Sequence, residues 1–128
     1  MPDFSKPNYE FIDTEERLKE VVEKELSSQD TIAVDTESDG LDPYLAKLLL
    51  IQIGTSEKAY IFDAQKIKDF SPLKPLFEGK KPLKILQNAK FDYEMLKVKT
   101  GLELNNIYDT FLAERILTCG ESRGVSNL

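Results

Sequence analysis

The stretch Thr31-Ile32-Ala33-Val34-Asp35-Thr36-Glu37 (residues 31–37) joins a run of apolar residues to two carboxylates that a single residue separates. Its first five residues have the composition of a short buried strand. Side chains two positions apart in a strand point to the same face, so Asp35 and Glu37 can converge on one cation. Taken alone, the pair is better explained by a strand end followed by a solvated loop residue.

The segments around this stretch predict an α/β domain. We expect helices at 13–28, 71–79, 91–99 and 109–118, and strands at 31–35, 48–53, 59–62, 84–88 and 107–108. The five-residue connection 54–58 has hairpin length, which predicts antiparallel neighbours. The fold class expected is therefore a mixed sheet, three antiparallel strands followed by parallel strands, flanked by helices.

Two of these helices carry more specific expectations. Asp13 or Thr14 can cap the first one, and Glu16 lies three residues after Asp13, as in a capping box. The helix at 109–118 has an apolar stripe that we expect to face inward, made of Leu112, Ala113, Ile116 and Leu117.

The amino-acid composition excludes several kinds of catalytic and metal site. The 128 residues contain no histidine and one cysteine, Cys119, which excludes serine-histidine and cysteine-histidine catalysis and any multi-thiolate zinc site. Oxygen ligands remain, and they suit magnesium or manganese. No apolar run has the length of a membrane span and no signal-peptide pattern opens the chain, so we expect one cytoplasmic domain and no membrane partner.

Charge is unevenly distributed. The net charge is −6, yet residues 1–64 carry 6 basic and 15 acidic side chains, whereas residues 65–128 carry 11 basic and 8 acidic ones. Carboxylates belong at the centre of a site that handles phosphate through bound divalent cations, because the cations supply the positive charge. The acidity is thus compatible with a nucleic-acid substrate.

A second candidate segment is Gln87-Asn88-Ala89-Lys90-Phe91-Asp92, where a strand passes into a helix. Asp92 falls in the first helical turn, where a carboxylate often only compensates the helix dipole. Strand ends and helix starts, however, meet at the edge of an α/β sheet where sites usually form. Three convergent carboxylates without histidine predict metal-assisted phosphoryl transfer.

These two segments resemble known motifs. Residues 34–42 resemble the first motif of the DEDD superfamily of 3′-5′ exonucleases, and residues 87–92 resemble the second, in the form found in DNA polymerase I proofreading domains and ribonuclease D. Residues 49–54 and 108–113 follow the same pattern, so the resemblance covers the chain from about Tyr9. It implies a ribonuclease H-like fold.

The resemblance also implies a mechanism. Asp35, Glu37 and Asp92 would be three of four acidic ligands for two divalent cations, Mg²⁺ or Mn²⁺, with Asp35 bridging both. The cations would activate a water and stabilise the leaving 3′ oxygen. The expected activity removes nucleoside monophosphates from single-stranded 3′ ends.

Four further residues would bind substrate by the same resemblance: Thr36, Leu41, Asn88 and Phe91. Leu41 would lie against the terminal base and Asn88 near the substrate. Leu41 could equally be a core residue, and Asn88 a turn or cap residue. We interpret Asp109 as a structural cap of the last helix rather than as the fourth ligand.

The family's third motif supplies the fourth carboxylate, and this sequence stops at residues 124–128 before that motif. We therefore expect one exonuclease domain over residues 1–128, a fragment that lacks the third motif, binds metal weakly and has low activity alone. The substrate expected is DNA, with a polymerase module as a partner. The alternatives are ribonuclease D-like trimming of RNA 3′ ends and a degenerate module that only binds nucleic acid.

Overall fold

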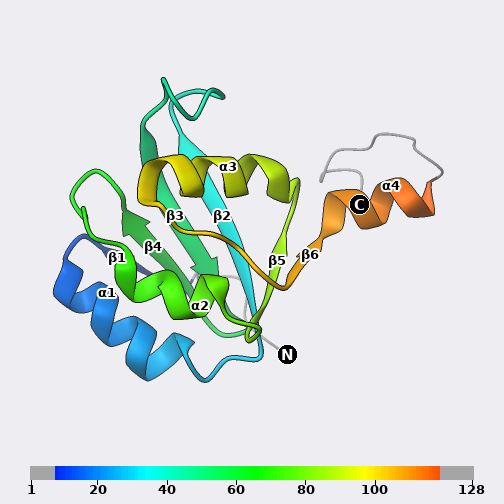
Figure 1. The fold of residues 1–128 in the computed structure, drawn as a ribbon. Helices are drawn as coiled ribbons and strands as arrows, with labels where there is room; N and C mark the ends of the chain where they lie inside the picture. The colour runs from blue at the N-terminus through cyan, green and yellow to red at the C-terminus, as the bar shows by residue number, and fades with distance from the viewer. Residues whose placement is uncertain (1–7, 119–128) are drawn as a thin grey trace.

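A computed structural model describes residues 8–118, so Cys119 and residues 124–128, where the sequence stops before the third motif, lie outside the described part of the chain. A mixed six-stranded sheet in the order β1-β4-β3-β2-β5-β6 forms the centre (Figure 1). Its strands are β1 (Tyr9–Ile12), β2 (Thr31–Ser38), β3 (Leu48–Gly54), β4 (Ala59–Asp63), β5 (Leu83–Leu86) and β6 (Ile107–Asp109). The expected α/β fold class is confirmed.

The pairing of the strands also agrees with expectation. Strands β2, β3 and β4 are antiparallel neighbours, and β5 and β6 continue the sheet in parallel with β2. The sequence did not predict β1, a four-residue strand that pairs in parallel with β4 and buries only Ile12. A strand this short, with a single buried side chain, has too little alternation to be recognised.

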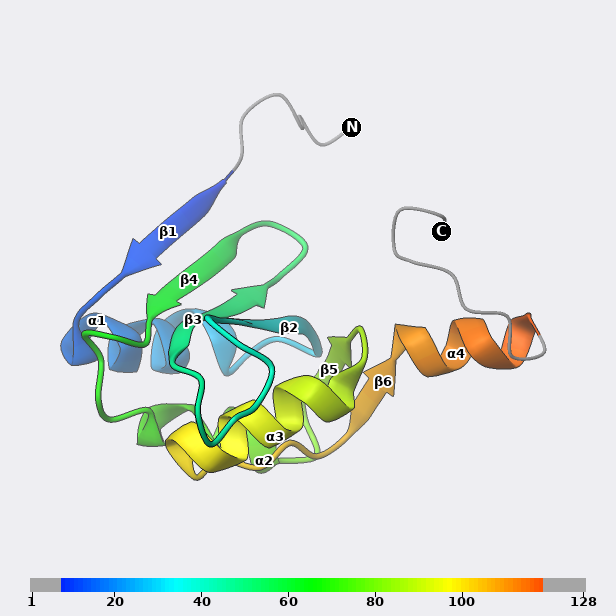
Figure 2. The same cartoon turned by 90° about the horizontal axis from the view of Figure 1, so that it is seen from above.

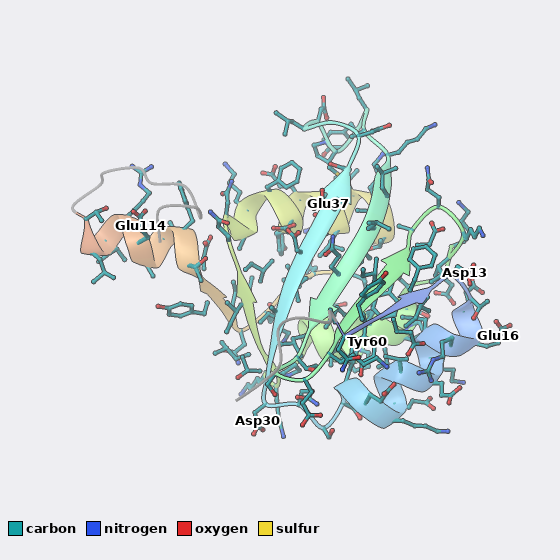
Figure 3. The ribbon with its side chains drawn as sticks, turned by 180° about the vertical axis from the view of Figure 1, so that it is seen from behind. Asp13, Glu16, Asp30, Glu37, Tyr60 and Glu114 are labelled. Atoms are coloured by element: carbon teal, nitrogen blue, oxygen red, sulfur yellow. The ribbon has the colours of Figure 1, made fainter. Side chains whose placement is uncertain are left out.

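The helices are α1 (Glu15–Val21), which continues as the π-helical turn η1 (Val22–Leu26), η2 (Ser71–Leu73), α2 (Lys74–Glu78), α3 (Ala89–Thr100) and α4 (Thr110–Leu117). Helices α1, α2 and α3 lie on one face of the sheet, as the views from the front and from behind show (Figures 1 and 3). Their apolar sides and that face form one core, in which Leu18, Phe62 and Phe77 are fully buried. No described helix is long and apolar enough to cross a membrane.

Helix α4 departs from expectation. It continues away from the sheet beyond β6 instead of packing on it (Figure 2). The inward-facing stripe was therefore wrong for three of its four residues: Leu112, Ile116 and Leu117 are 57%, 79% and 84% exposed. Ala113 is half-buried. Apolar periodicity shows which side of a helix avoids water, but not which element covers that side.

The first helix begins one residue later than a capping box at Asp13 requires. Thr14 has extended backbone angles, and its hydroxyl accepts a hydrogen bond from the Arg17 N–H at 3.2 Å. Asp13 instead pairs with Lys66 at 3.3 Å. The box was wrong because the residue three positions after the true cap is Arg17, whose side chain cannot accept the return bond.

We expect Thr14→Ala to lower the free energy of unfolding by about 1 kcal/mol, because an N–H of the first turn then loses its acceptor. Asp13→Ala should cost less, roughly 0.5 kcal/mol, since it removes one exposed ion pair. Urea unfolding of the two variants checks this. A larger loss for Asp13→Ala would place the cap at Asp13 after all.

Candidate active site

Strand β2 presents the first two candidate carboxylates. Its side chains alternate strictly, so Thr36 is buried while Asp35 and Glu37 are exposed on the opposite face. Both carboxylates lie within the strand, which extends three residues further than the sequence predicted. Glu37 stands near the end of β2 on the face that the described helices leave open (Figure 3).

Helix α3 brings the third carboxylate to this strand. Asp92 is 3% exposed, and its Oδ1 accepts hydrogen bonds from the Thr36 N–H at 2.9 Å and from the Thr36 hydroxyl at 2.6 Å. The Thr36 amide is free to donate because β5 pairs with β2 only as far as Ala33. Asp92 of α3 is thereby held against Thr36, the residue between Asp35 and Glu37.

The pKa of Asp92 is shifted by its burial and by neighbouring groups. Burial raises the pKa of Asp92 from its usual 3.8 to about 6; the hydrogen bond from the Thr36 hydroxyl opposes the rise, and repulsion by the Asp35 carboxylate adds to it. A bound cation stabilises two carboxylates that repel each other.

The donor chemistry fits a hard cation, since carboxylate oxygens are what Mg²⁺ and Mn²⁺ prefer. Among residues 8–118, however, no three side chains of histidine, cysteine, aspartate or glutamate gather closely enough to hold a metal. Asp92 Oδ1 accepts two hydrogen bonds from Thr36. The structure thus brings Asp92 beside the Asp35 strand without completing a ligand set.

A shallow pocket of about 420 Å³ adjoins Glu37. Three of the four predicted substrate-binding residues line it, namely Thr36, Leu41 and Phe91, whereas Asn88 does not. Leu41 is 83% exposed, so its interpretation as a core residue was wrong. An exposed leucine and a half-buried phenylalanine at the rim provide apolar surface next to the carboxylates.

The loop between β2 and β3 carries two residues that the sequence did not single out. Tyr44 and Leu45 are 79% and 85% exposed, beside Leu41. Two bonds close the base of the loop, one from the Asp39 N–H to the Lys47 carbonyl and one from the Lys47 N–H to the Asp39 carboxylate. Three large apolar side chains on one exposed loop are a signal for binding that the sequence already contained.

Asn88 lies at the start of α3 with left-handed backbone angles (φ 56°, ψ 59°), and its side chain makes no capping bond there. Its N–H donates to Asp109 Oδ1 at 2.9 Å, and the Ala89 N–H donates to Asp109 Oδ2 at 2.8 Å. Asp109 also accepts from the Phe111 N–H at 2.9 Å, which confirms it as the cap of α4. It therefore caps two helices, and the second role could not be predicted because it joins segments 21 residues apart.

We expect Asp109→Ala to lower the free energy of unfolding by about 2 kcal/mol, because three N–H groups are left without a charged acceptor. Asp69→Ala is the matched control, since it removes one exposed bond to the Ser71 N–H. Thermal unfolding of both variants measures the difference. Equal losses of stability would mean that the two bonds that Asp109 accepts from the start of α3 contribute nothing.

A mixed six-stranded sheet with flanking helices is the ribonuclease H-like α/β architecture that the sequence predicts. The family model for 3′-5′ exonucleases matches residues 9–128. The chain therefore belongs to the 3′-5′ exonuclease family, within the DEDD superfamily that its two motifs resemble.

Sequence relatives agree. The chain is 41% identical over 103 residues to ribonuclease D of Desulfotalea psychrophila, covering 80% of this chain and 27% of that protein. It is 35% identical over 107 residues to an exosome complex component 10 homolog of Drosophila melanogaster, covering 83% and 12%. It is 30% identical over 110 residues to DNA polymerase I of Aquifex aeolicus, covering 86% and 18%. The chain thus spans only a small part of each relative.

Solved structures confirm the fold. Ribonuclease D of Escherichia coli, an exoribonuclease involved in structured RNA processing, matches with a TM-score of 0.81 at 28% identity over 92% of this chain and 31% of that one. The catalytic core of RRP6 from Trypanosoma brucei matches with a TM-score of 0.81 at 28% identity, covering 91% and 33%.

Proposed function

We propose that this chain is a single metal-dependent exonuclease domain that removes nucleoside monophosphates from RNA 3′ ends. The observation that carries the proposal is the pair of hydrogen bonds from Thr36 to Asp92. They hold a buried carboxylate of α3 beside the strand that presents Asp35 and Glu37. The family membership supports the reaction class.

Each carboxylate has a distinct task in this proposal. Asp35 and Glu37 present their oxygens from one face of β2, and Asp92 contributes from α3 while Thr36 fixes its position. When bound, a pair of Mg²⁺ or Mn²⁺ ions would supply an activated water and stabilise the leaving oxygen. The raised pKa of Asp92 is consistent with a site built to be neutralised by cations.

The pocket beside Glu37 would receive the terminal nucleotide. Leu41 and Phe91 line this pocket and offer apolar surface on which a base can stack. Asn88, at the start of α3, would contact the strand from the β5 side. None of these contacts reads a base edge, so the expected enzyme has little sequence preference.

RNA is favoured over DNA by the relatives. Identity to ribonuclease D is 41%, against 30% to DNA polymerase I. The DNA substrate and the polymerase partner expected from the sequence remain predictions, and the DNA polymerase I relative is the observation that supports them.

The test uses RNA and DNA of the same sequence and length, labelled at the 5′ end, with an excess of protein and with Mn²⁺ or Mg²⁺. We expect a ladder that shortens from the 3′ end, faster on RNA, and no cutting when the 3′ end is blocked or the metal is chelated. Internal cleavage would contradict the polarity. Binding without any cutting would favour the degenerate nucleic-acid-binding module instead.

A further inference from the structure

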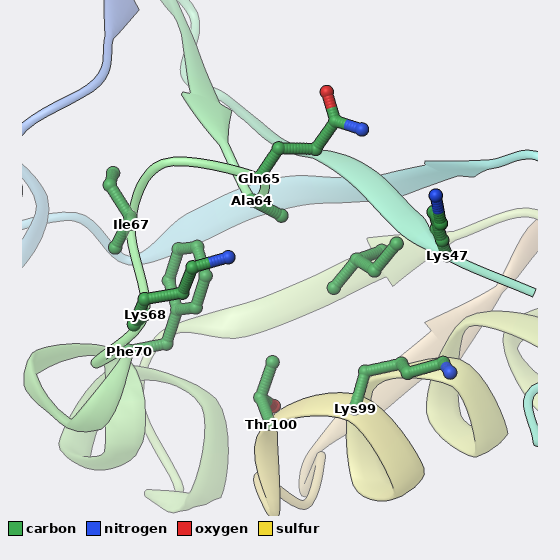
Figure 4. Close-up of a pocket in the computed structure, with 9 residues that line it drawn as sticks. Lys47, Ala64, Gln65, Ile67, Lys68, Phe70, Lys99 and Thr100 are labelled. Atoms are coloured by element: carbon green, nitrogen blue, oxygen red, sulfur yellow. The ribbon is translucent and has the colours of Figure 1, made fainter.

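A second pocket, of about 440 Å³, opens at the same edge of the sheet (Figure 4). Lys47 stands directly before β3, Lys68 follows β4, and Lys99 lies in the last turn of α3. Figure 4 shows Lys68 on one side of the pocket and the other two lysines on the opposite side. Three separate segments of the chain thus bring positive charge to one hollow.

These three lysines lack the carboxylate partners that half of the other described lysines have. Five lysines form ion pairs with carboxylates: Lys24, Lys58, Lys66, Lys81 and Lys97. Within residues 8–118, by contrast, the ammonium groups of Lys47, Lys68 and Lys99 make no ion pair or hydrogen bond, and no acidic side chain lines their pocket. Cations gathered around a hollow attract an anion, even in a chain of net charge −6.

The rest of the lining narrows the chemistry of that anion. The Gln65 side chain adds an amide, and the almost fully buried Leu48, Ile67 and Phe70 also line the pocket. Ammonium and amide groups donate hydrogen bonds to phosphate oxygens. The polar part of the lining therefore fits a phosphate group.

The pocket is close to the candidate active site. Leu48, the first residue of β3, pairs with Ser38, which directly follows Glu37. Crossing from β2 to β4 takes two strand spacings, roughly 10 Å. The nucleic-acid strand would also pass the edge of the sheet, because Glu37 lies on the face opposite to α3, which carries Lys99. The exposed Tyr44 and Leu45 lie on the loop between the two sites, where unpaired bases could stack.

We propose that the Lys47–Lys68–Lys99 pocket binds a backbone phosphate of the nucleic-acid strand upstream of its 3′-terminal nucleotide. This inference rests on the proposed function and adds to it a place where the strand is held. Lysine contacts to phosphate set affinity and carry no sequence information. The pocket therefore favours longer strands over short ones, whatever their bases.

The test compares two triple variants with equal loss of charge. K47Q/K68Q/K99Q removes the pocket lysines, and K19Q/K74Q/K80Q removes three exposed lysines elsewhere. Binding of 5′-labelled single-stranded RNA is measured by fluorescence anisotropy in EDTA over a range of salt concentrations. We expect the pocket variant to bind roughly tenfold more weakly, with a salt slope reduced by about 0.7 for each phosphate that the protein no longer neutralises. The control variant should stay within about twofold of the parent chain.

Trimming of a dinucleotide tests the two proposals separately, because a dinucleotide reaches only the pocket beside Glu37. The parent chain and the pocket variant should trim it equally. If the parent chain trims RNA and the pocket variant binds long strands as tightly as the parent chain, the pocket inference fails and the proposed function stands. A loss of dinucleotide trimming in the pocket variant, or competition by inorganic phosphate without any dependence on strand length, would also overturn the inference. If the parent chain neither binds nor trims, both proposals fail.

Discussion

Asp35→Asn is expected to abolish Mn²⁺ binding and to lower the rate of 3′-end trimming by at least about a thousandfold, or about 4 kcal/mol of transition-state stabilisation. Asparagine keeps the shape of the side chain but removes the charge that a cation needs. Single-turnover trimming of 5′-labelled RNA measures the rate. Calorimetric titration with Mn²⁺ measures binding, and this second readout does not depend on activity.

The variant should fold at least as well as the parent chain. The Asp35 carboxylate repels that of Asp92, so its removal relieves an unfavourable interaction. The matched control is Asp30→Asn, near the opposite end of β2, where a carboxylate that is 90% exposed pairs with Lys81 at 2.9 Å (Figure 3). If Asp35→Asn trims RNA and binds Mn²⁺ as the parent chain does, Asp35 is not part of the site. An equal loss of trimming in Asp30→Asn would make the effect nonspecific.

The structural features that depend on neighbouring residues could be predicted from the sequence. The alternation in 31–37 placed Asp35 and Glu37 on one face, and the strand-to-helix passage at 87–92 placed Asp92 in the first turn of α3. The hairpin length at 54–58 predicted the antiparallel pairing of β3 and β4. Each of these depends on residues within a few positions of one another.

Contacts between distant segments were not predictable in the same way. Thr36 and Asp92 are 56 positions apart, and the bond from the Thr36 N–H requires that β5 ends its pairing with β2 early enough to free this amide. The capping of α3 by Asp109 likewise requires β5 and β6 to be neighbours. A single sequence shows that Thr36 and Asp109 can form hydrogen bonds, but not with which partners.

The burial of Asp92 leads to the second large effect. We expect Asp92→Asn to raise the free energy of unfolding at about pH 7.5 in EDTA by up to roughly 3 kcal/mol. The amide oxygen of asparagine can still accept the bonds from Thr36, while the cost of burying a charge beside Asp35 disappears. Trimming should be lost at the same time, so stability and activity move in opposite directions.

The pH dependence follows from the sign of the pKa shift. Asp92 has a pKa of about 6 in the folded chain and 3.8 ordinarily, so between these values the folded state keeps a proton that the unfolded chain has released. Each rise in pH within this window favours unfolding, and above about pH 6 the full cost is present. The advantage of Asp92→Asn should therefore be close to zero below about pH 4 and grow up to about pH 6.

Urea unfolding at about pH 4 and about pH 7.5 compares Asp92→Asn with the parent chain, and Asp30→Asn, whose carboxylate is exposed, serves as the control. An advantage of the same size at both pH values would show that Asp92 is not a buried charge. At saturating Mn²⁺ the parent chain should become more stable than Asp92→Asn. A cation that binds the folded parent chain stabilises it by mass action, and the variant has lost a ligand. A carboxylate that destabilises the metal-free fold and stabilises the metal-bound one is placed there for the cation, and no purely structural role for Asp92 produces that reversal.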